Sequence, residues 1–192
     1  NSISKNNSSP SAYNKGTSVD ITITNQRSST KEISGGGTTE FSFDFSVPDS
    51  AKSGDTTTIS LPDQLDFQRS QKFNIYALDG KTVVATAVID KPSRSLVLTY
   101  TDYVDSHDSI SGHIDMQVTA ATSEINKEET IPAEIKINGH TVTIDSSGIK
   151  HRPSKGDTAT DFWKYGYVDY DNNKNEIVYH VNINASMQSV SN

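Results

Sequence analysis

The strongest constraint on this chain is a strict alternation of apolar and polar side chains. Between Glu40 and Val47, the aromatic residues Phe41, Phe43 and Phe45 alternate with serine and aspartate. A period of two places alternate side chains on opposite faces of a strand, so this segment predicts a strand that is buried on one face. Burying each Phe contributes roughly 1.5–3 kcal/mol. We therefore expect these three rings to form the centre of a core.

Shorter alternating segments recur along the chain and predict further strands. They cover residues 18–25, 57–61, 72–78, 82–89, 95–100, 113–120, 131–137, 141–144 and 177–183. The further positions expected to join the core are Ile59, Leu61, Leu96, Leu98 and Tyr100. Two dipeptides, Asp79-Gly80 and Asn138-Gly139, fit tight hairpin turns because they accept positive φ angles.

Signals for helices are poor. The best helical window, Ser123–Thr130, is short and polar and is closed by Pro132, so it predicts at most one or two turns on the surface. About eight or nine short strands within about 130 residues, separated by turn residues, are typical of an antiparallel sandwich. The expected fold class is therefore all-β.

Shifts in composition divide the chain into four parts. Residues 1–16 have no periodicity and predict a disordered tail, and residues 17–146 predict the sandwich. Residues 147–160, rich in Ser, Gly, Lys and Pro, predict a linker, and residues 161–192 predict the start of a second, truncated domain. So short a piece cannot bury the strand at 177–183 by itself. We expect that strand to pair with another sheet edge, from this chain or from a neighbour.

Charge and composition exclude several classes of function. The net charge of -7, from 24 acidic and 17 basic residues, argues against nucleic-acid binding, because no basic stripe exists to displace counterions. The chain has no cysteine, which excludes thiolate catalysis, zinc ribbons, iron–sulfur clusters and disulfides. No stretch approaches the ~20 apolar residues that a membrane helix needs, so we expect no membrane insertion.

Four motifs resemble those of a known family. Gly54–Pro62 (GDTTTISLP) and Thr99–Val104 (TYTDYV) are similar to segments of an amino-terminal subdomain of Gram-positive, cell-wall-anchored surface adhesins that bind collagen or fibrinogen. Downstream, residues 162–166 (FWKYG) and 177–184 (IVYHVNIN) are similar to the start of the next subdomain. The resemblance spans about residues 17–184, with the motifs in the same order and the linker in the same place.

This resemblance implies a variant immunoglobulin-like sandwich, repeated in tandem, that captures a host extracellular-matrix protein of the collagen or fibrinogen class. It also implies an extracellular location on the bacterial cell surface. In fibrinogen-type members an added strand locks the ligand at a sheet edge. The aromatic residues Tyr165, Tyr167 and Tyr170 are candidates for a ligand-binding or interdomain surface.

The resemblance also points to Lys164. In the family, a Lys at this place can form an amide bond with an Asn on a late strand, assisted by a buried acid. Burial lowers the pKa of an amine and gives the neutral nucleophile that such a bond requires. The Asn and the acid would lie beyond Asn192, and an ordinary solvated Lys164 is an equal alternative.

The other candidate sites favour ordinary structural roles. Residues 169–175 (DYDNNKN) carry oxygen ligands at alternate positions, but they lack the Gly and Glu of an EF-hand, so a hydrated loop is favoured over a calcium site. The carboxylates of Asp102, Asp105 and Asp108 favour a solvated acidic turn over acid–base catalysis. Gly35–Gly37 indicates a turn rather than a phosphate cradle, and the five histidines are widely separated. We expect no enzyme, no metal and no cofactor.

Three functions remain after these exclusions. The first is capture of a host matrix protein by a surface adhesin. The second is a stalk or pilus module that gives spacing and mechanical strength. A carbohydrate-active domain is a third and weak alternative, because the chain has a single Trp.

Overall fold

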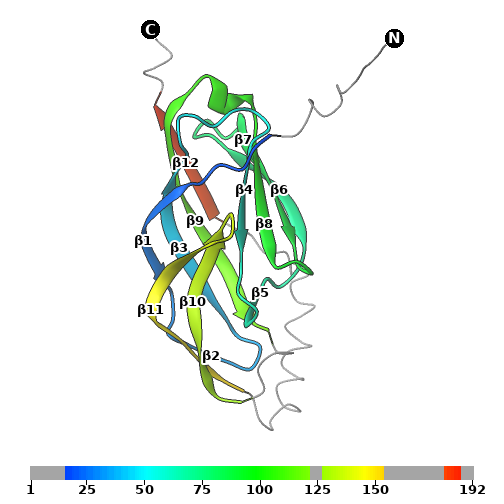
Figure 1. Cartoon of the computed structure of the whole chain (residues 1–192), viewed down its shortest axis with the longest axis vertical. Coiled ribbons are helices and arrows are strands. Elements are labelled where there is room, and N and C mark those ends of the chain that lie inside the picture. Colours follow the sequence, from blue (N-terminus) through cyan, green and yellow to red (C-terminus); the bar gives the residue numbers. More distant parts are fainter. Residues whose placement is uncertain (1–15, 122–126, 154–179, 187–192) are drawn as a thin grey trace, which may run out of the picture.

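In the computed structural model, residues 16–121, 127–153 and 180–186 are described, and they form a β-sandwich (Figure 1). Its elements are β1 (Thr22–Ser28), β2 (Glu32–Ser34), β3 (Thr38–Ser46), β4 (Thr56–Ser60), β5 (Leu65–Asp66), β6 (Gln71–Tyr76), β7 (Val83–Asp90), β8 (Ser95–Tyr100), the 3-10 helix η1 (Asp102–Asp105), β9 (Asp108–Ala120), β10 (Glu129–Ile137), β11 (His140–Arg152) and β12 (His180–Ser186). The short η1 is the only helix among the described residues.

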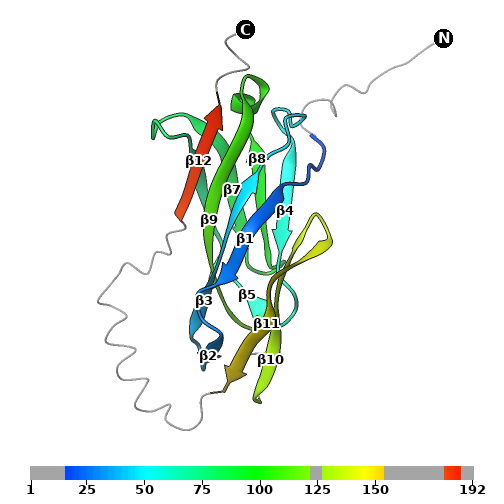
Figure 2. The ribbon, with the colours of Figure 1, turned by 90° about the vertical axis from the view of Figure 1, so that its left-hand side faces the viewer.

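The strands form two sheets that pack face to face (Figure 2). One sheet has the order β1-β3-β9-β12, with β5 also paired to β9, and the other has the order β2-β11-β10-β4-β8-β7-β6. The pairs are antiparallel except for β2 with β11. The prediction of an all-β, immunoglobulin-like antiparallel sandwich is confirmed.

The core lies between the two sheets and centres on β3. The side chains of Phe41 and Phe43 are fully buried and that of Phe45 is nearly so. Their partners on β9 include Met116 for Phe41 and Ile114 for Phe43, and both of these are buried too. The other expected core positions, Ile59, Leu61, Leu96, Leu98 and Tyr100, are also buried. Period two therefore places one face of β3, β4 and β8 in the core, as a sandwich requires.

The hairpin between β10 and β11 shows why its turn carries Asn-Gly. Asn138 and Gly139 adopt φ angles of 49° and 89°, and Ile137 pairs directly with His140 across the turn. Two consecutive positive φ angles match the twist of the flanking strands, and Asn followed by Gly accepts them at low cost. The prediction of a hairpin here is confirmed.

Two sequence-based boundaries are wrong. The expected linker starts inside a strand, because residues 147–152 continue β11, with the left-handed Gly148 (φ 74°) placed where the register with β10 shifts. The helical window fails at Glu129 and Thr130, which begin β10 and pair with β11. Residues 122–126 and 154–160 lie outside the described part of the chain.

The last described strand, β12, adds to the sheet that contains β3. It pairs antiparallel with β9 over a register that runs from His180 with Asp115 to Ser186 with Asp108. The expectation that a strand near residues 177–183 pairs with a sheet edge is therefore confirmed for the described residues, and the edge belongs to this chain. Residues 161–179 of the expected second domain lie outside the described residues.

Candidate binding surfaces

The first candidate surface is the edge of β9 on which β12 lies, residues Asp108–Asp115, here called the β9 edge. A strand at the border of a sheet exposes backbone N–H and C=O groups that another strand can pair with. In this chain the strand on the β9 edge is β12, which lies far beyond β11 in the sequence. The β9 edge therefore accepts a strand that is not joined to β9 by a hairpin.

A network of polar side chains lies beside the β9 edge. His113 bridges two carboxylates, with Nδ1 2.8 Å from an oxygen of Asp44 on β3 and Nε2 2.8 Å from an oxygen of Asp115. Ser42 donates to Asp115 (2.6 Å), and the amide of Asn25 donates to Asp44 (2.7 Å). These contacts tie three neighbouring strands together on the solvent-facing side of the sheet.

The same contacts change the proton affinity of two groups. The hydrogen bond to Asp44, followed by that to Asp115, raises the pKa of His113 above its usual value. The hydrogen bonds from Asn25 and then His113 lower the pKa of Asp44. Opposite shifts in neighbouring groups are those of an ion pair, so the imidazole is favoured in its charged form.

A shallow groove of about 480 Å³ lies next to this network. Its walls include Thr22, Thr24 and Ser46, together with His113 and Asp44 of the network. Hydroxyl groups and a carboxylate suit the polar side chains of an extended polypeptide better than an apolar ligand. The groove therefore offers polar contacts to a ligand.

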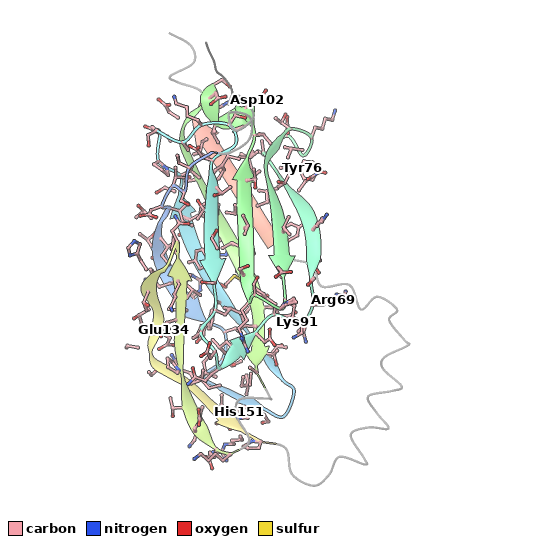
Figure 3. The ribbon with its side chains drawn as sticks, turned by 45° about the vertical axis from the view of Figure 1, so that its right-hand side comes forward. Arg69, Tyr76, Lys91, Asp102, Glu134 and His151 are labelled. Atoms are coloured by element: carbon pink, nitrogen blue, oxygen red, sulfur yellow. The ribbon has the colours of Figure 1, made fainter. Side chains whose placement is uncertain are left out.

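The acidic turn expected from sequence lies at η1 and the start of β9. Asp105 accepts a hydrogen bond from the backbone N–H of Ser53 (3.0 Å), which gives it a structural role. His107 stacks on the ring of Tyr103 with 3.8 Å between ring centroids, and its Nδ1 contacts the Tyr103 carbonyl oxygen (2.9 Å). Asp102 is exposed at the upper end of the sandwich (Figure 3).

The described ranges offer neither a metal site nor a membrane-spanning helix. Within them, no group of three or more His, Asp or Glu residues is arranged to hold a metal ion. No helix in residues 16–121, 127–153 and 180–186 could span a bilayer. The triplet Gly35–Gly37 is the turn between β2 and β3, where the Gly37 N–H donates to the carbonyl of Ser34 (2.8 Å).

Several sequence-predicted site residues lie outside the described residues. They are Lys164, Tyr165, Tyr167, Tyr170 and the loop 169–175. Their roles stay predictions.

The structure explains the GDT motif, whose function the sequence did not reveal. Asp55 is only 7% exposed, and its carboxylate accepts the N–H groups of Thr17 (2.9 Å) and Lys52 (2.8 Å). Burial alone would raise the pKa of Asp55, but these N–H donors outweigh it and the pKa is lowered. The hydroxyl of Thr57 lies 2.8 Å from that of Tyr100 and donates to the carbonyl of Val19. The motif therefore anchors the start of the domain.

Sandwich topology and these surfaces define an immunoglobulin-like domain in which a strand from distant sequence adds to a sheet edge. The family described as Bacterial Ig domain matches residues 32–130, and the chain belongs to this family. The match covers the β2–β9 region and the start of β10.

Similar proteins are surface adhesins. The chain is 29% identical over 132 residues to clumping factor A of Staphylococcus aureus (strain Mu50 / ATCC 700699), covering 63% of this chain and 14% of that protein. It is 26% identical over 147 residues to the fibrinogen-binding protein of Staphylococcus epidermidis, covering 72% of this chain and 13% of that protein. The predicted resemblance to Gram-positive surface adhesins is confirmed.

A solved structure shows the same fold. The collagen adhesin (CNA) from S. aureus superposes with a TM-score of 0.53 at 17% identity, covering 75% of this chain and 47% of that chain. The chain thus spans less than half of that structure and a small part of its curated relatives. Adhesins of this Ig-like class are not enzymes, in agreement with the prediction of no turnover chemistry.

Proposed function

We propose that this chain is part of a bacterial surface adhesin that captures an extended host matrix protein without covalent chemistry. The observation that carries the proposal is the pairing of β12 with the β9 edge. A sheet edge that accepts a strand from distant sequence can bind an extended polypeptide by the same backbone hydrogen bonds. The names of the relatives support the same class of function.

The side chains beside this edge would give the contact its selectivity. Backbone pairing supplies affinity that depends little on sequence, whereas alternate side chains of an added strand meet the sheet surface. Here that surface carries the groove with Thr22 and Thr24 and the charged pair of His113 and Asp44. A ligand strand with polar side chains would fit this surface.

The ligand class we propose is fibrinogen or collagen. Fibrinogen is supported by the protein from S. epidermidis, and collagen by the fold shared with the collagen adhesin. In the proposed arrangement residues 161–179 contribute to a second Ig-like domain, and the host polypeptide lies between the two domains. Residues 180–186 instead pair with the β9 edge of this sandwich. Tyr165, Tyr167 and Tyr170 would then face the ligand or the neighbouring domain, and Lys164 would form the amide bond of that second domain.

The proposed location is the outer surface of a Gram-positive bacterium, with the full-length protein anchored to the cell wall. The location follows from the surface adhesins that the chain resembles. Labelling intact cells with an antibody against the sandwich, before and after enzymatic digestion of the wall, would test both statements.

Binding to immobilised fibrinogen and collagen tests the function. The protein used should include the whole second domain, and saturable binding to either ligand is the expected result. Absence of binding across a panel of host matrix proteins would contradict the proposal and favour the stalk or pilus module.

A reversible lock tests the role of the β9 edge. Ser111 and Asn184 are partners across β9 and β12, and the chain has no natural cysteine, so Ser111→Cys with Asn184→Cys can form a single disulfide. If the ligand uses this edge, the oxidised variant loses saturable binding and a reductant restores it. The single variant Ser111→Cys is the control. Equal binding in the oxidised and reduced states would exclude the edge.

A further inference from the structure

A second hollow lies at the upper end of the sandwich, between the β6–β7 turn and η1. It has a volume of about 650 Å³, and its walls include Leu78, Asp79, Asp102, Tyr103 and His107. We call it the Asp102 pocket. It is lined by a different set of residues from the groove beside β9. Figure 3 shows Asp102 at this end of the molecule.

Part of the wall is apolar and exposed. Leu78 is 73% exposed, the largest value among the exposed large apolar side chains of the described residues. The stacked rings of Tyr103 and His107 add a flat surface, with an angle of 7° between the ring planes. A single exposed Leu needs no explanation, but this Leu lines the same hollow as the ring pair. The wall can cover the aliphatic part of a ligand.

The charge of the pocket is negative. Asp79 and Asp102 contribute carboxylates, and the described residues that line the pocket include no Lys or Arg. Lys81 follows in the same turn but does not line the pocket. The hydroxyl of Thr82, its N–H and the N–H of Lys81 lower the pKa of Asp79 to about 2, so this carboxylate stays ionised near neutral pH.

The walls are held in place before any ligand arrives. Three hydrogen bonds to its carboxylate fix the turn around Asp79. The hydroxyl of Thr101 accepts the N–H of Tyr103 (3.2 Å) and donates to the carbonyl of Val83 (2.6 Å), which ties η1 to β7. A pocket with fixed walls loses little entropy when it binds.

We propose that the Asp102 pocket docks a Lys or Arg side chain of a partner polypeptide. The aliphatic stem of that side chain lies along Leu78 and the ring pair, and its cationic head reaches the two carboxylates. Long basic side chains combine an apolar stem with a charged tip, and this pocket offers both surfaces within one hollow. The contact goes beyond the proposed function, because it does not depend on strand addition at the β9 edge.

Titration of the complete, ¹⁵N-labelled chain with short peptides tests the proposal. The probes are acetyl-Gly-Arg-Gly-amide and acetyl-Gly-Lys-Gly-amide, with acetyl-Gly-Gln-Gly-amide as the uncharged comparison. We expect the basic peptides to shift the backbone signals of Leu78, Asp79 and residues 102–107. The Gln peptide should bind several-fold more weakly, and added salt should weaken the basic peptides.

Paired variants identify the groups that bind. Asp102→Asn should weaken the Arg peptide about threefold, as expected for the loss of one exposed ion pair, and Leu78→Ser should weaken it as well. Asp63→Asn is the matched control, because Asp63 is an exposed carboxylate in the loop between β4 and β5 and does not line the pocket. Equal shifts with the Gln peptide, no shifts with the Arg peptide up to about 20 mM, or equal losses in Asp102→Asn and Asp63→Asn would overturn the proposal.

Discussion

The buried polar side chains at the two ends of the sandwich differ in whether they have hydrogen-bond partners. At the upper end, Asp55, Thr57 and Tyr100 are buried, and each has a hydrogen-bond partner. Asp55 accepts the N–H of Thr17, and the hydroxyl of Thr57 bonds to the carbonyl of Val19 and to the hydroxyl of Tyr100. At the lower end (Figure 3), His151 is 2% exposed, and among the described residues neither of its ring nitrogens has a hydrogen-bond partner. At the upper end, hydrogen bonds offset the free-energy cost of burying polar groups. At the lower end, this cost is not offset for His151.

The difference follows from the neighbours that each end provides. Asp55 lies where the chain turns into β4, so free backbone N–H groups are close to its carboxylate. His151 lies within β11, and its register partners are Ile33 on β2 and Glu129 on β10. Backbone groups within a paired strand already bond to each other, so an inward-facing imidazole there finds few free donors or acceptors.

The largest expected effect comes from β3, which both ends share. Phe43→Asp should prevent folding, because it removes a fully buried ring and places a carboxylate in the core. We expect no cooperative transition in a thermal melt followed by circular dichroism. Phe43→Leu, which keeps the site apolar, should still fold with a lower Tm. A cooperative melt of Phe43→Asp would show that β3 is not central to the core.

Removal of the Asp55 carboxylate should affect the upper end strongly. Asp55→Ala leaves the N–H groups of Thr17 and Lys52 without their acceptor, which should lower the free energy of unfolding by about 3 kcal/mol. Because the pKa of Asp55 is lowered on folding, its contribution is present above the unfolded value of about 3.9 and is lost as the pH falls through the folded value. Urea unfolding at pH 7 and pH 3 measures both effects. An equal difference between wild type and variant at the two pH values would contradict this account.

Much of the sandwich could be predicted from sequence because its strands alternate cleanly. The burial of Phe41, Phe43 and Phe45 follows from period two. The turn at Asn138-Gly139 follows from the ability of Asn and Gly to adopt the positive φ angles that the structure shows. The short strands β2 and β5 contain three and two residues, too few for a period to show. The extension of β11 beyond Ser146 is hidden by Ser and Gly residues that resemble a linker.

The candidate sites could be predicted much less well. The network around His113 depends on the register of β3 with β9, which places His113 opposite Asp44 and Asp115 opposite Ser42. No local pattern reveals that pairing. The Asp102 pocket joins a turn near Leu78 to η1, two segments that only the fold brings together. Sequence did single out Asp102, but as part of an acidic turn.

A pair of substitutions should change stability in opposite directions at the two ends. Tyr100→Phe removes the hydroxyl that bonds Thr57 and should cost about 1 kcal/mol. His151→Leu removes two unpaired nitrogens from the core and should leave stability unchanged or raise it by up to about 1 kcal/mol. Urea unfolding under one set of conditions compares the two directly. Destabilisation by His151→Leu as large as that by Tyr100→Phe would show that His151 does have a polar partner in solution.

The smallest expected effect concerns His113, which lies on the surface away from both buried sites. Because its pKa is raised on folding, mainly by the bond to Asp44, its contribution is fully present below the unfolded value of about 6.5 and is lost as the pH rises through the folded value. The Tm difference between wild type and His113→Gln should therefore be larger at pH 5.5 than at pH 8.5. His140→Gln, a substitution at an exposed histidine in the β10–β11 hairpin, is the matched control for the loss of an imidazole. Since the cluster is partly open to water, the effect should stay below that of any substitution in the core. A Tm difference that is the same at both pH values would mean that the network around His113 makes no pH-dependent contribution to stability.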